Sequence, residues 1–594
     1  MRRPEFSPLV LLALALAVGS GALEVGLRVS PRMGMLGGDV GALLLASIGL
    51  SIAYLVAAAV FAWRLGRKPY GVLLGALVLV HGALWYRFEV VLNRFASDPR
   101  VWGGLLGVVI LAVGVAYVSD ALVRRFRGGV ILASLAVGLV GTGMAIHRSK
   151  APSGRPDDSR PNVLVITLDT VRADHLSPYG SDNPTPTLDS LARDGVLFEH
   201  VVATAPVTEP SHLAIFTGQP PHMSGVVANG TRLGDRPALL WRAMRDHGWT
   251  TAGFVAGFPL HSRFGWAQGM DVYDDDFGRF RGLHSLSLVK AWDQLVLPAH
   301  TLRERRGDLV VERALGWLSE HHDESFFMWV HLFDPHAPYE APGHPFDPPT
   351  DGEPLDLPDY WPPKYKAITS TEWLIDAYDA EIRYADELVG QLLDGLRFHN
   401  VLEDTIVVVT ADHGESLTEH DYLFEHGDNL YDPSLLIPLI VRYPKELKRG
   451  RRVPCQVSND DITPTLLSLT GLAALPEQQA IEREGRDLSE MLRGGGCTDK
   501  PIVSSTVSVR FVDRPPVDHS YREPERKLIR MGEGGESCFD LVADPGELHP
   551  VRCDPELGRA LDEALAGATT AAAPETDSTT NAALEALGYI DGSP

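Results

Sequence analysis

A threonine at the start of an apolar helix is the first residue in this chain that could do chemistry. Residues 207–218 read Val-Thr-Glu-Pro-Ser-His-Leu-Ala-Ile-Phe-Thr-Gly. Pro210 suits the first helical position, where the N–H that proline lacks has no partner, and the apolar run continues to Gly218. A helix N-terminus offers unpaired N–H groups and a partial positive charge. The pattern therefore predicts Thr208 beside a pocket for a phosphate or sulfate group.

Two carboxylates follow apolar strands and could hold a metal ion. Asp169 comes directly after the run 162–168, and Asp412-His413 follows the run 405–411. In open α/β sheets, ligands bind outside the carboxyl ends of the strands. A single Asp there more often caps a helix, but two such sites and Thr208 at consistent positions favour a divalent ion such as Zn²⁺ or Mn²⁺. That ion could lower the pKa of the Thr208 hydroxyl and polarise an ester oxygen.

Strands and helices alternate through the second part of the chain. Further strands are predicted at Thr251–Ala256, Phe326–Asp334 and Leu436–Tyr443, and helices at Leu309–His321 and Trp373–Phe398. This alternation predicts an α/β fold whose mostly parallel sheet is flanked by helices.

The first 150 residues have a different character. They carry fifteen Lys/Arg and six Asp/Glu, a net charge of +9. Their five apolar runs are long enough for about five transmembrane helices, although the first alone could be a signal peptide and buried core helices are the alternative. Basic residues before the first run and after the second and fourth favour a cytoplasmic N-terminus. The runs are Pro8–Leu23, Val40–Trp63, Tyr70–Tyr86, Val101–Val118 and Val130–Ile146.

This orientation places residues from 151 onward on the periplasmic or extracellular side of a bacterial cytoplasmic membrane. The exported part carries 38 basic and 71 acidic residues, which argues against nucleic acid as a partner because phosphate binding needs clustered Lys/Arg. We expect a transmembrane domain over 1–150, a linker over 151–160, a catalytic core over 161–470 and a C-terminal subdomain with a tail over 471–594.

The four cysteines all lie in the exported part. An even number in an oxidising compartment indicates disulfides. Proximity alone favours the pairs Cys455–Cys497 and Cys538–Cys553. Two other connectivities, and four free thiols, stay open.

Several segments together resemble the sulfatase branch of the alkaline phosphatase superfamily. They include Asp-Thr-Val-Arg-Ala-Asp at 169–174, Pro-Ser with Thr-Gly within 210–218, Asp-Pro-His at 334–336 and Thr-Ala-Asp-His-Gly-Glu at 410–415. Segments at 378–382, 461–467 and 539–545 resemble the core and C-terminal parts of that family. The resemblance covers roughly residues 160–550 in the family's order and implies an alkaline-phosphatase-like α/β core.

The resemblance also implies roles for individual residues. Asp169, Asp412 and His413, together with Thr208, would hold one or two divalent ions (Zn, Mn or Ca), and Thr208 would be the nucleophile. Three further residues would be catalytic. Arg172 would contact the metal-bound group or orient Thr208, His336 would bind the ester oxyanion or assist the leaving group, and His426 would be another oxyanion contact or a second-metal ligand. His261 is a weaker candidate, and packing or surface positions are the expectation for His212, His222 and His420.

Three positions depart from the sulfatase pattern. Sulfatases carry Cys or Ser in place of Thr208 and oxidise it to formylglycine, an aldehyde that threonine cannot give because its β-carbon bears a methyl group. Thr170 replaces the second Asp of the usual pair, and Gly427 stands near where a lysine usually meets the sulfate. A threonine nucleophile behind five spans resembles phosphoethanolamine transferases and lipoteichoic acid synthases instead.

The sequence thus predicts a membrane-anchored, metal-dependent hydrolase of the sulfatase family. Its substrate would be a sulfated or phosphorylated glycan or lipid. One alternative is a phosphoethanolamine- or phosphoglycerol-type transferase that modifies envelope glycans or lipids. Another is a catalytically inactive binding module.

Overall fold

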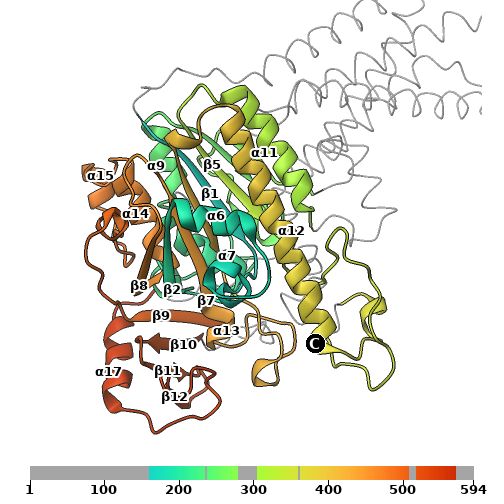
Figure 1. Cartoon of the computed structure of the whole chain (residues 1–594). Helices are drawn as coiled ribbons and strands as arrows, with labels where there is room; N and C mark the ends of the chain where they lie inside the picture. The colour runs from blue at the N-terminus through green and yellow to red at the C-terminus, as the bar shows by residue number, and fades with distance from the viewer. Residues whose placement is uncertain (1–159, 235–236, 278–303, 359–360, 508–516, 570–594) are drawn as a thin grey trace, which may run out of the picture. The chain divides into compact units, whose positions relative to one another are not determined.

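The computed structural model describes residues 160–234, 237–277, 304–358, 361–507 and 517–569 (Figure 1). The predicted membrane spans, nearly all of the linker and the tail beyond residue 569 lie outside these ranges. Within the described residues, no helix has both the length and the apolar character needed to cross a membrane.

An eight-stranded sheet forms the core, in the order β4-β3-β5-β1-β6-β7-β2-β8. All neighbours are parallel except that β7 runs antiparallel to both β6 and β2. The prediction of a mostly parallel sheet is therefore confirmed. The antiparallel direction of β7 was not predicted. The strands are β1 (Asn162–Leu168), β2 (Val196–Val202), β3 (Thr250–Phe254), β4 (Val272–Asp274), β5 (Phe326–Leu332), β6 (Thr405–Ala411), β7 (Leu436–Arg442) and β8 (Arg451–Ser458).

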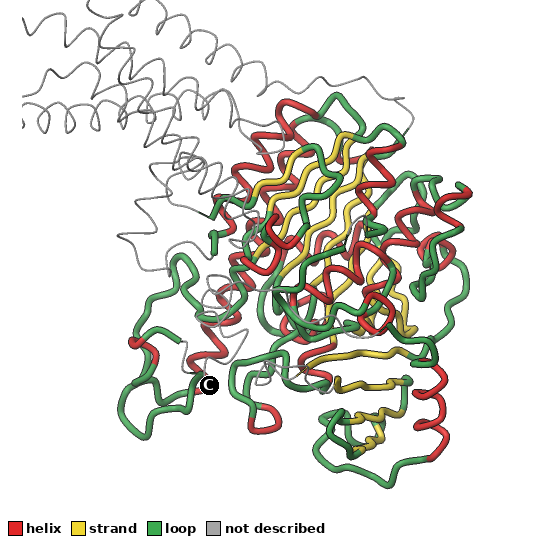
Figure 2. Tube along the Cα trace, turned by 180° about the vertical axis from the view of Figure 1, so that it is seen from behind, coloured by secondary structure: helices red, strands yellow, loops and turns green. Residues whose placement is uncertain are grey.

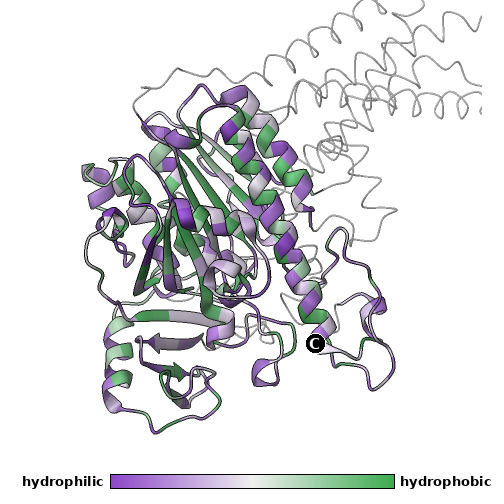
Figure 3. Cartoon of the chain, viewed as in Figure 1, coloured by the Kyte–Doolittle hydropathy of each residue, from purple (hydrophilic) through white to green (hydrophobic). Residues whose placement is uncertain are grey.

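Apolar side chains explain why β1, β5 and β6 occupy the centre. Every residue of these three strands is buried, as expected for a parallel sheet covered on both faces. Figure 3 shows the strands as mainly hydrophobic beneath helices of mixed character, and Figure 2 shows the same layers from behind. The helices are α6 (Pro186–Asp194), α7 (Thr208–Thr217), α8 (Pro221–Ser224), α9 (Leu240–Asp246), α11 (Gly307–His321), α12 (Thr371–Phe398), α13 (Asp432–Leu435), α14 (Ile462–Leu469), α15 (Pro476–Gln479), α16 (Ser489–Arg493) and α17 (Pro555–Ala564).

Helix α7 starts earlier than the proline pattern predicts. Thr208 is its first residue, Val207 is the N-cap, and Pro210 is the third helical residue rather than the first. Proline is tolerated there because the N–H groups of the first turn have no partner inside the helix. Gly218 ends the helix in a left-handed conformation, with φ of 74°.

A smaller antiparallel sheet follows the core. It has the order β12-β11-β10-β9, with β9 (Ile502–Val507), β10 (Val517–Arg522), β11 (Arg526–Arg530) and β12 (Glu536–Asp540). Helix α17 packs on it around Leu528 and Leu561. Disulfides join Cys455 to Cys497 and Cys538 to Cys553, which confirms the favoured pairing.

Candidate metal and nucleophile site

Strand register brings the two predicted carboxylates side by side. Leu168 of β1 pairs with Ala411 of β6, so Asp169 and Asp412 leave the sheet at the same level. The first turn of helix α7 lies beside Asp412: the Ser211 hydroxyl donates a 2.6 Å hydrogen bond to the Asp412 carbonyl. We call Asp169, Thr208, Asp412 and His413 the metal–nucleophile site; all four side chains are fully buried.

Each member of this site presents one buried polar atom that has no hydrogen-bond partner. These atoms are Asp169 Oδ1, Thr208 Oγ1, Asp412 Oδ2 and His413 Nε2. His413 Nε2 lies 3.5 Å from Asp412 Oδ2 and 3.9 Å from Asp169 Oδ1. Such orphaned atoms are rare in native proteins and call for an explanation such as a bound ion. Two carboxylates, one imidazole and one hydroxyl fit a divalent cation.

The remaining atoms of the site are held by hydrogen bonds that leave the orphaned atoms available. Asp412 Oδ1 accepts the N–H groups of Thr170 at 3.2 Å and His413 at 2.9 Å. His413 Nδ1 lies 2.9 Å from the Gly414 carbonyl, so Nδ1 carries the proton and Nε2 keeps its lone pair. A metal-ligating histidine typically has this arrangement, with its other nitrogen bonded to a carbonyl.

The electrostatics of the site also favour a cation. Burial raises the pKa of Asp169 to about 7, although the nearby His413 lowers it. Among the described residues, the ion-pair partners of Asp169 and Asp412 are histidines. A divalent ion would favour the ionised carboxylates that burial otherwise penalises.

Of the two predicted catalytic histidines, His426 lies beside His413 and His336 lies beside His426. The His426 ring is 4.4 Å from that of His413 and 5.0 Å from that of His336, measured between ring centroids. His426 Nδ1 is 3.1 Å from a Glu415 carboxylate oxygen, and His336 Nδ1 is 2.7 Å from the Ala337 carbonyl. Burial lowers the pKa of His426 to about 4 and that of His336 well below its usual value. Both rings are therefore neutral near pH 7.

The side chain of Arg172 contacts residues outside the metal–nucleophile site. Its guanidinium forms two hydrogen bonds with the Asp174 carboxylate, at 3.0 and 2.8 Å, one of 2.7 Å with Glu419 and one of 3.2 Å with the Glu415 carbonyl. Thr208 and the metal ligands are not among these partners. The geometry thus gives Arg172 a positioning role: it holds the loop that follows His413.

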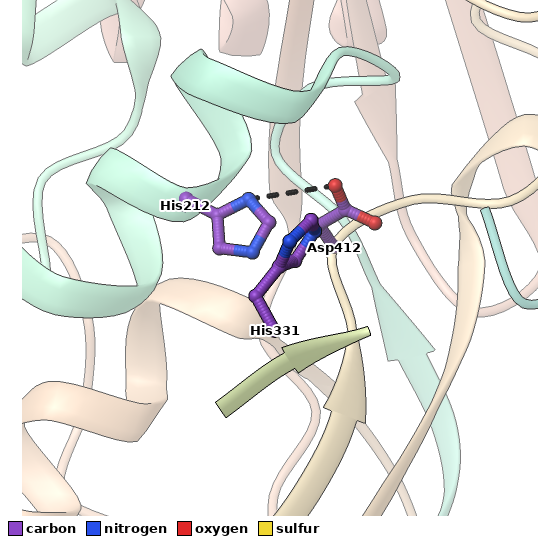
Figure 4. A group of neighbouring side chains, drawn as sticks. All are labelled: His212, His331 and Asp412. Atoms are coloured by element: carbon purple, nitrogen blue, oxygen red, sulfur yellow. Dashed lines mark ion pairs between the residues drawn. The ribbon is translucent and has the colours of Figure 1, made fainter. Parts of the chain in front are cut away.

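Sequence reasoning missed His331 and assigned His212 to packing. His331 lies on β5 and its Nε2 is 3.0 Å from Asp169 Oδ2. His212 lies one turn along α7, with Nδ1 3.4 Å from Asp412 Oδ2 (Figure 4). A polar residue near the carboxyl end of the apolar run 326–332 was the available signal for His331.

The other candidate histidines lie in separate contacts. His261 is 3.3 Å from Asp275, and His222 is 2.7 Å from Glu484. His420 stacks on Tyr431 at a centroid distance of 3.6 Å. The contacts of His222 and His420 agree with packing or surface positions, and His261 was the weaker catalytic candidate.

Comparison with known proteins shows the family to which the chain is similar. A model described as Sulfatase matches residues 161–472. An ulvan-active sulfatase of Formosa agariphila is 26% identical over 421 residues, covering 69% of this chain and 80% of that protein. A choline-sulfatase of Rhizobium meliloti is 27% identical over 430 residues, covering 66% and 82%. The crystal structure of a phosphonate monoester hydrolase of Agrobacterium radiobacter shares the fold, with a TM-score of 0.55 and 22% identity over 69% of this chain and 96% of that chain.

Proposed function

Since this chain belongs to the sulfatase family of ester hydrolases, we propose that it is a membrane-anchored, metal-dependent hydrolase of sulfate or phosphate esters with Thr208 as its nucleophile. The observation that carries the proposal is the set of four unpartnered buried atoms in the metal–nucleophile site. They belong to the same residues that the sequence assigns to the metal and the nucleophile.

A divalent ion held by Asp169, Asp412 and His413 would act as a Lewis acid on the ester group and on the Thr208 hydroxyl. Thr208 Oγ1 forms a bond to sulfur or phosphorus as the bond to the ester oxygen breaks. The hydroxyl gives up one proton and the departing alcohol takes up one. Water then cleaves the sulfo- or phosphothreonine and restores the hydroxyl.

His336 and His426 suit the leaving-group side of this reaction. The two rings are adjacent and neutral. His336 donates its Nδ1 proton to the Ala337 carbonyl, so its Nε2 can accept a hydrogen bond from the departing alcohol. His426, by contrast, can donate from Nε2 to the departing oxygen when Glu415 carries a proton. Glu415 holds His426 through Nδ1. Whether His426 carries its proton on Nε2 or on Nδ1 depends on the ionisation of Glu415. Burial raises the pKa of Glu415 to about 8.

The apolar runs in residues 1–150 support membrane anchoring, with the catalytic unit on the periplasmic or extracellular side. Two disulfides in the described part support an oxidising compartment. The names of the relatives support a small or polymeric sulfated substrate, as in ulvan-active sulfatase and choline-sulfatase. A sulfated or phosphorylated glycan or lipid of the cell envelope fits both the fold and the anchoring.

Replacing the nucleophile tests the proposal. Thr208→Ala should lower turnover of an aryl sulfate or a phosphodiester by at least about 10³-fold, with bound metal retained, since three ligands remain. Thr208→Ser keeps the hydroxyl and should retain measurable turnover. Turnover that is unchanged in Thr208→Ala would overturn the nucleophile assignment, and elemental analysis that finds no divalent metal in the wild-type protein would overturn the metal dependence.

A threonine in place of the formylglycine precursor is the observation that favours the transferase alternative. A fluorescent phospholipid incubated with the full-length protein and envelope glycan separates the two activities. Release of a free headgroup supports hydrolysis, whereas a labelled glycan shows group transfer and contradicts the hydrolase assignment.

A further inference from the structure

A chain of hydrogen bonds runs from the sheet to the backbone of Thr208. The Trp329 indole N–H donates to Thr167 Oγ1 at 3.0 Å, and Thr167 Oγ1 lies 3.0 Å from His212 Nε2. At the other side of the ring, His212 Nδ1 lies 2.8 Å from the Thr208 carbonyl oxygen. Thr167 and His212 are wholly buried. None of the catalytic roles proposed above uses this chain.

The chemistry of the partners determines where the proton of His212 lies. A carbonyl oxygen only accepts, so the 2.8 Å contact with Thr208 requires a proton on His212 Nδ1. With the proton on Nδ1, the lone pair lies on Nε2, which faces the Thr167 hydroxyl. The Thr167 hydroxyl, which accepts from the indole, then donates to Nε2. Trp329, Thr167 and His212 thus hold one tautomer.

The same Nδ1 proton also faces the metal site. His212 Nδ1 is 3.4 Å from Asp412 Oδ2, and Figure 4 shows the ring on α7 directed at this carboxylate. His331 occupies the matching place on the other carboxylate. Its Nδ1 accepts the Ala256 N–H at 3.3 Å, so Nε2 carries the proton and donates to Asp169 Oδ2 at 3.0 Å.

His212, His331 and Asp412 lie close enough together to be considered as a second cation site. Their hydrogen bonds favour a different assignment. Both nitrogens of each ring have a partner, and the nitrogens that face the carboxylates carry protons rather than lone pairs. A cation there would displace at least two of these bonds.

We propose that His212 is a positioning residue, which through its Nδ1–H orients the Thr208 peptide, and hence Oγ1, against Asp412. This inference rests on the proposed role of Thr208 as nucleophile. Thr208 is the first residue of α7, where the backbone has few helical restraints. The ring of His212 adds a second tie, four residues along, to the carbonyl next to the reacting side chain.

Two near-isosteric substitutions separate the nitrogens of the ring. His212→Asn places an amide N–H near Nδ1 and keeps the donor to Thr208, whereas His212→Gln reaches the Nε2 position and keeps only the contact with Thr167. We expect His212→Gln to lower kcat by about 10- to 100-fold with KM changed by less than about threefold. His212→Asn should recover most of kcat, and both variants should retain one metal ion per chain.

A double-mutant cycle with Thr208→Ala tests whether His212 acts through the nucleophile. If it does, His212→Gln causes no further loss in the Thr208→Ala background. A further loss equal to that in the wild-type background overturns the proposal, as does a His212→Asn variant that is no better than His212→Gln. Two metal ions in the wild type, with one lost in His212→Gln, would show that His212 is a ligand.

Failure of the proposed function has a different signature. In that case Thr208→Ala itself retains turnover, whatever the His212 variants do. Thermal unfolding midpoints of the full-length variants in detergent check that each one folds. If His212→Gln folds and lowers kcat by the same factor with and without Thr208→Ala, His212 has a role that is independent of Thr208.

Discussion

Two buried groups of charged side chains in this protein differ in how their charge is balanced. One is the metal–nucleophile site. The other, which we call the Asp432 ion cluster, consists of Asp432, Arg522, Lys527 and Glu547, and it joins α13 to the smaller sheet. All four of its residues are less than 9% exposed.

In the Asp432 ion cluster, the chain supplies its own cations. Lys527 Nζ lies 2.8 Å from Asp432 Oδ1 and 2.8 Å from Glu547 Oε1, and Arg522 Nη2 lies 2.8 Å from Asp432 Oδ2. Burial alone would raise the pKa of Asp432, but Lys527 and Arg522 hold it below its usual value. In the metal–nucleophile site, burial raises the pKa of Asp169 to about 7.

A structural ion cluster and a site that receives a ligand differ in the source of the opposite charge. Buried charge is tolerated when opposite charge is close. The Asp432 ion cluster has that charge built in, so it contributes to the connection between two parts of the fold. The metal–nucleophile site has buried carboxylates whose described ion-pair partners are histidines, and one atom on each of its four members forms no hydrogen bond.

Removing one carboxylate from each group should separate metal binding from stability. Asp412→Asn should lower turnover by at least about 10³-fold and reduce bound metal from one ion per chain to nearly none, because a charged ligand is lost. The free energy of unfolding without metal should not fall, because an uncompensated buried charge has been removed. Elemental analysis and urea unfolding measure the two effects.

The matched control is Asp432→Asn, which should keep the metal and lose about 2–4 kcal/mol of unfolding free energy, since two cations lose their partner. If Asp412→Asn still binds one ion tightly, the ligand assignment is wrong.

Removing a cation from the Asp432 ion cluster should affect stability alone. Lys527→Met leaves Glu547 without its cation and Asp432 with only Arg522, and we expect a loss of about 3–5 kcal/mol in unfolding free energy with metal content unchanged. Lys445→Met breaks an exposed pair with Asp404 and should cost less than about 1 kcal/mol. Equal losses in the two variants would contradict the structural role of the cluster.

The two groups should have opposite pH dependences in the metal-free protein. The pKa of Asp169 is raised from 3.8 to about 7, so the folded state binds more protons than the unfolded state in this interval. Its contribution to stability therefore falls as the pH rises from about 4 to about 7. The lowered pKa of Asp432 stabilises the folded state above the pKa of the unfolded chain, and this contribution is lost as the pH falls toward the lowered value.

Thermal unfolding midpoints across this interval, with a chelator and with Mn²⁺ or Zn²⁺, check these signs. The increase in midpoint caused by metal should be largest at about pH 7. In Asp169→Asn, this increase should depend less on pH. A metal-dependent gain that is independent of pH would contradict the electrostatic picture of the site.

Much of the fold follows from local patterns in the sequence. The apolar runs at 162–168, 326–332 and 405–411 are central strands, and the predicted helix 373–398 is most of α12. Strands β2 and β8 were not predicted. Both lie towards one edge of the sheet and carry charged side chains, such as Glu199 and Arg452, which interrupt the apolar pattern.

The candidate site was predicted in part for the same reason. Asp169, Asp412 and His413 stand at strand ends, which a sequence pattern reveals, and the structure brings them together. The family resemblance implied that Arg172 contacts the metal-bound group or orients Thr208. In the structure the chain turns at Thr170, whose φ is 58°, and Arg172 pairs with Asp174 and Glu419.

The chemical types can be read from the amino-acid sequence: a threonine that cannot become an aldehyde, carboxylates at strand ends, and cysteines whose spacing favours two disulfides. These properties depend on covalent structure and on local apolar periodicity. Three features depend on the folded structure: which buried polar atoms form no hydrogen bond, the pairing of Arg172 with Asp174 and Glu419, and the tautomers of His212 and His331 beside the carboxylates. Hydrogen bonds between strands and helices distant in sequence decide these features, because proton positions depend on every neighbour of the ring.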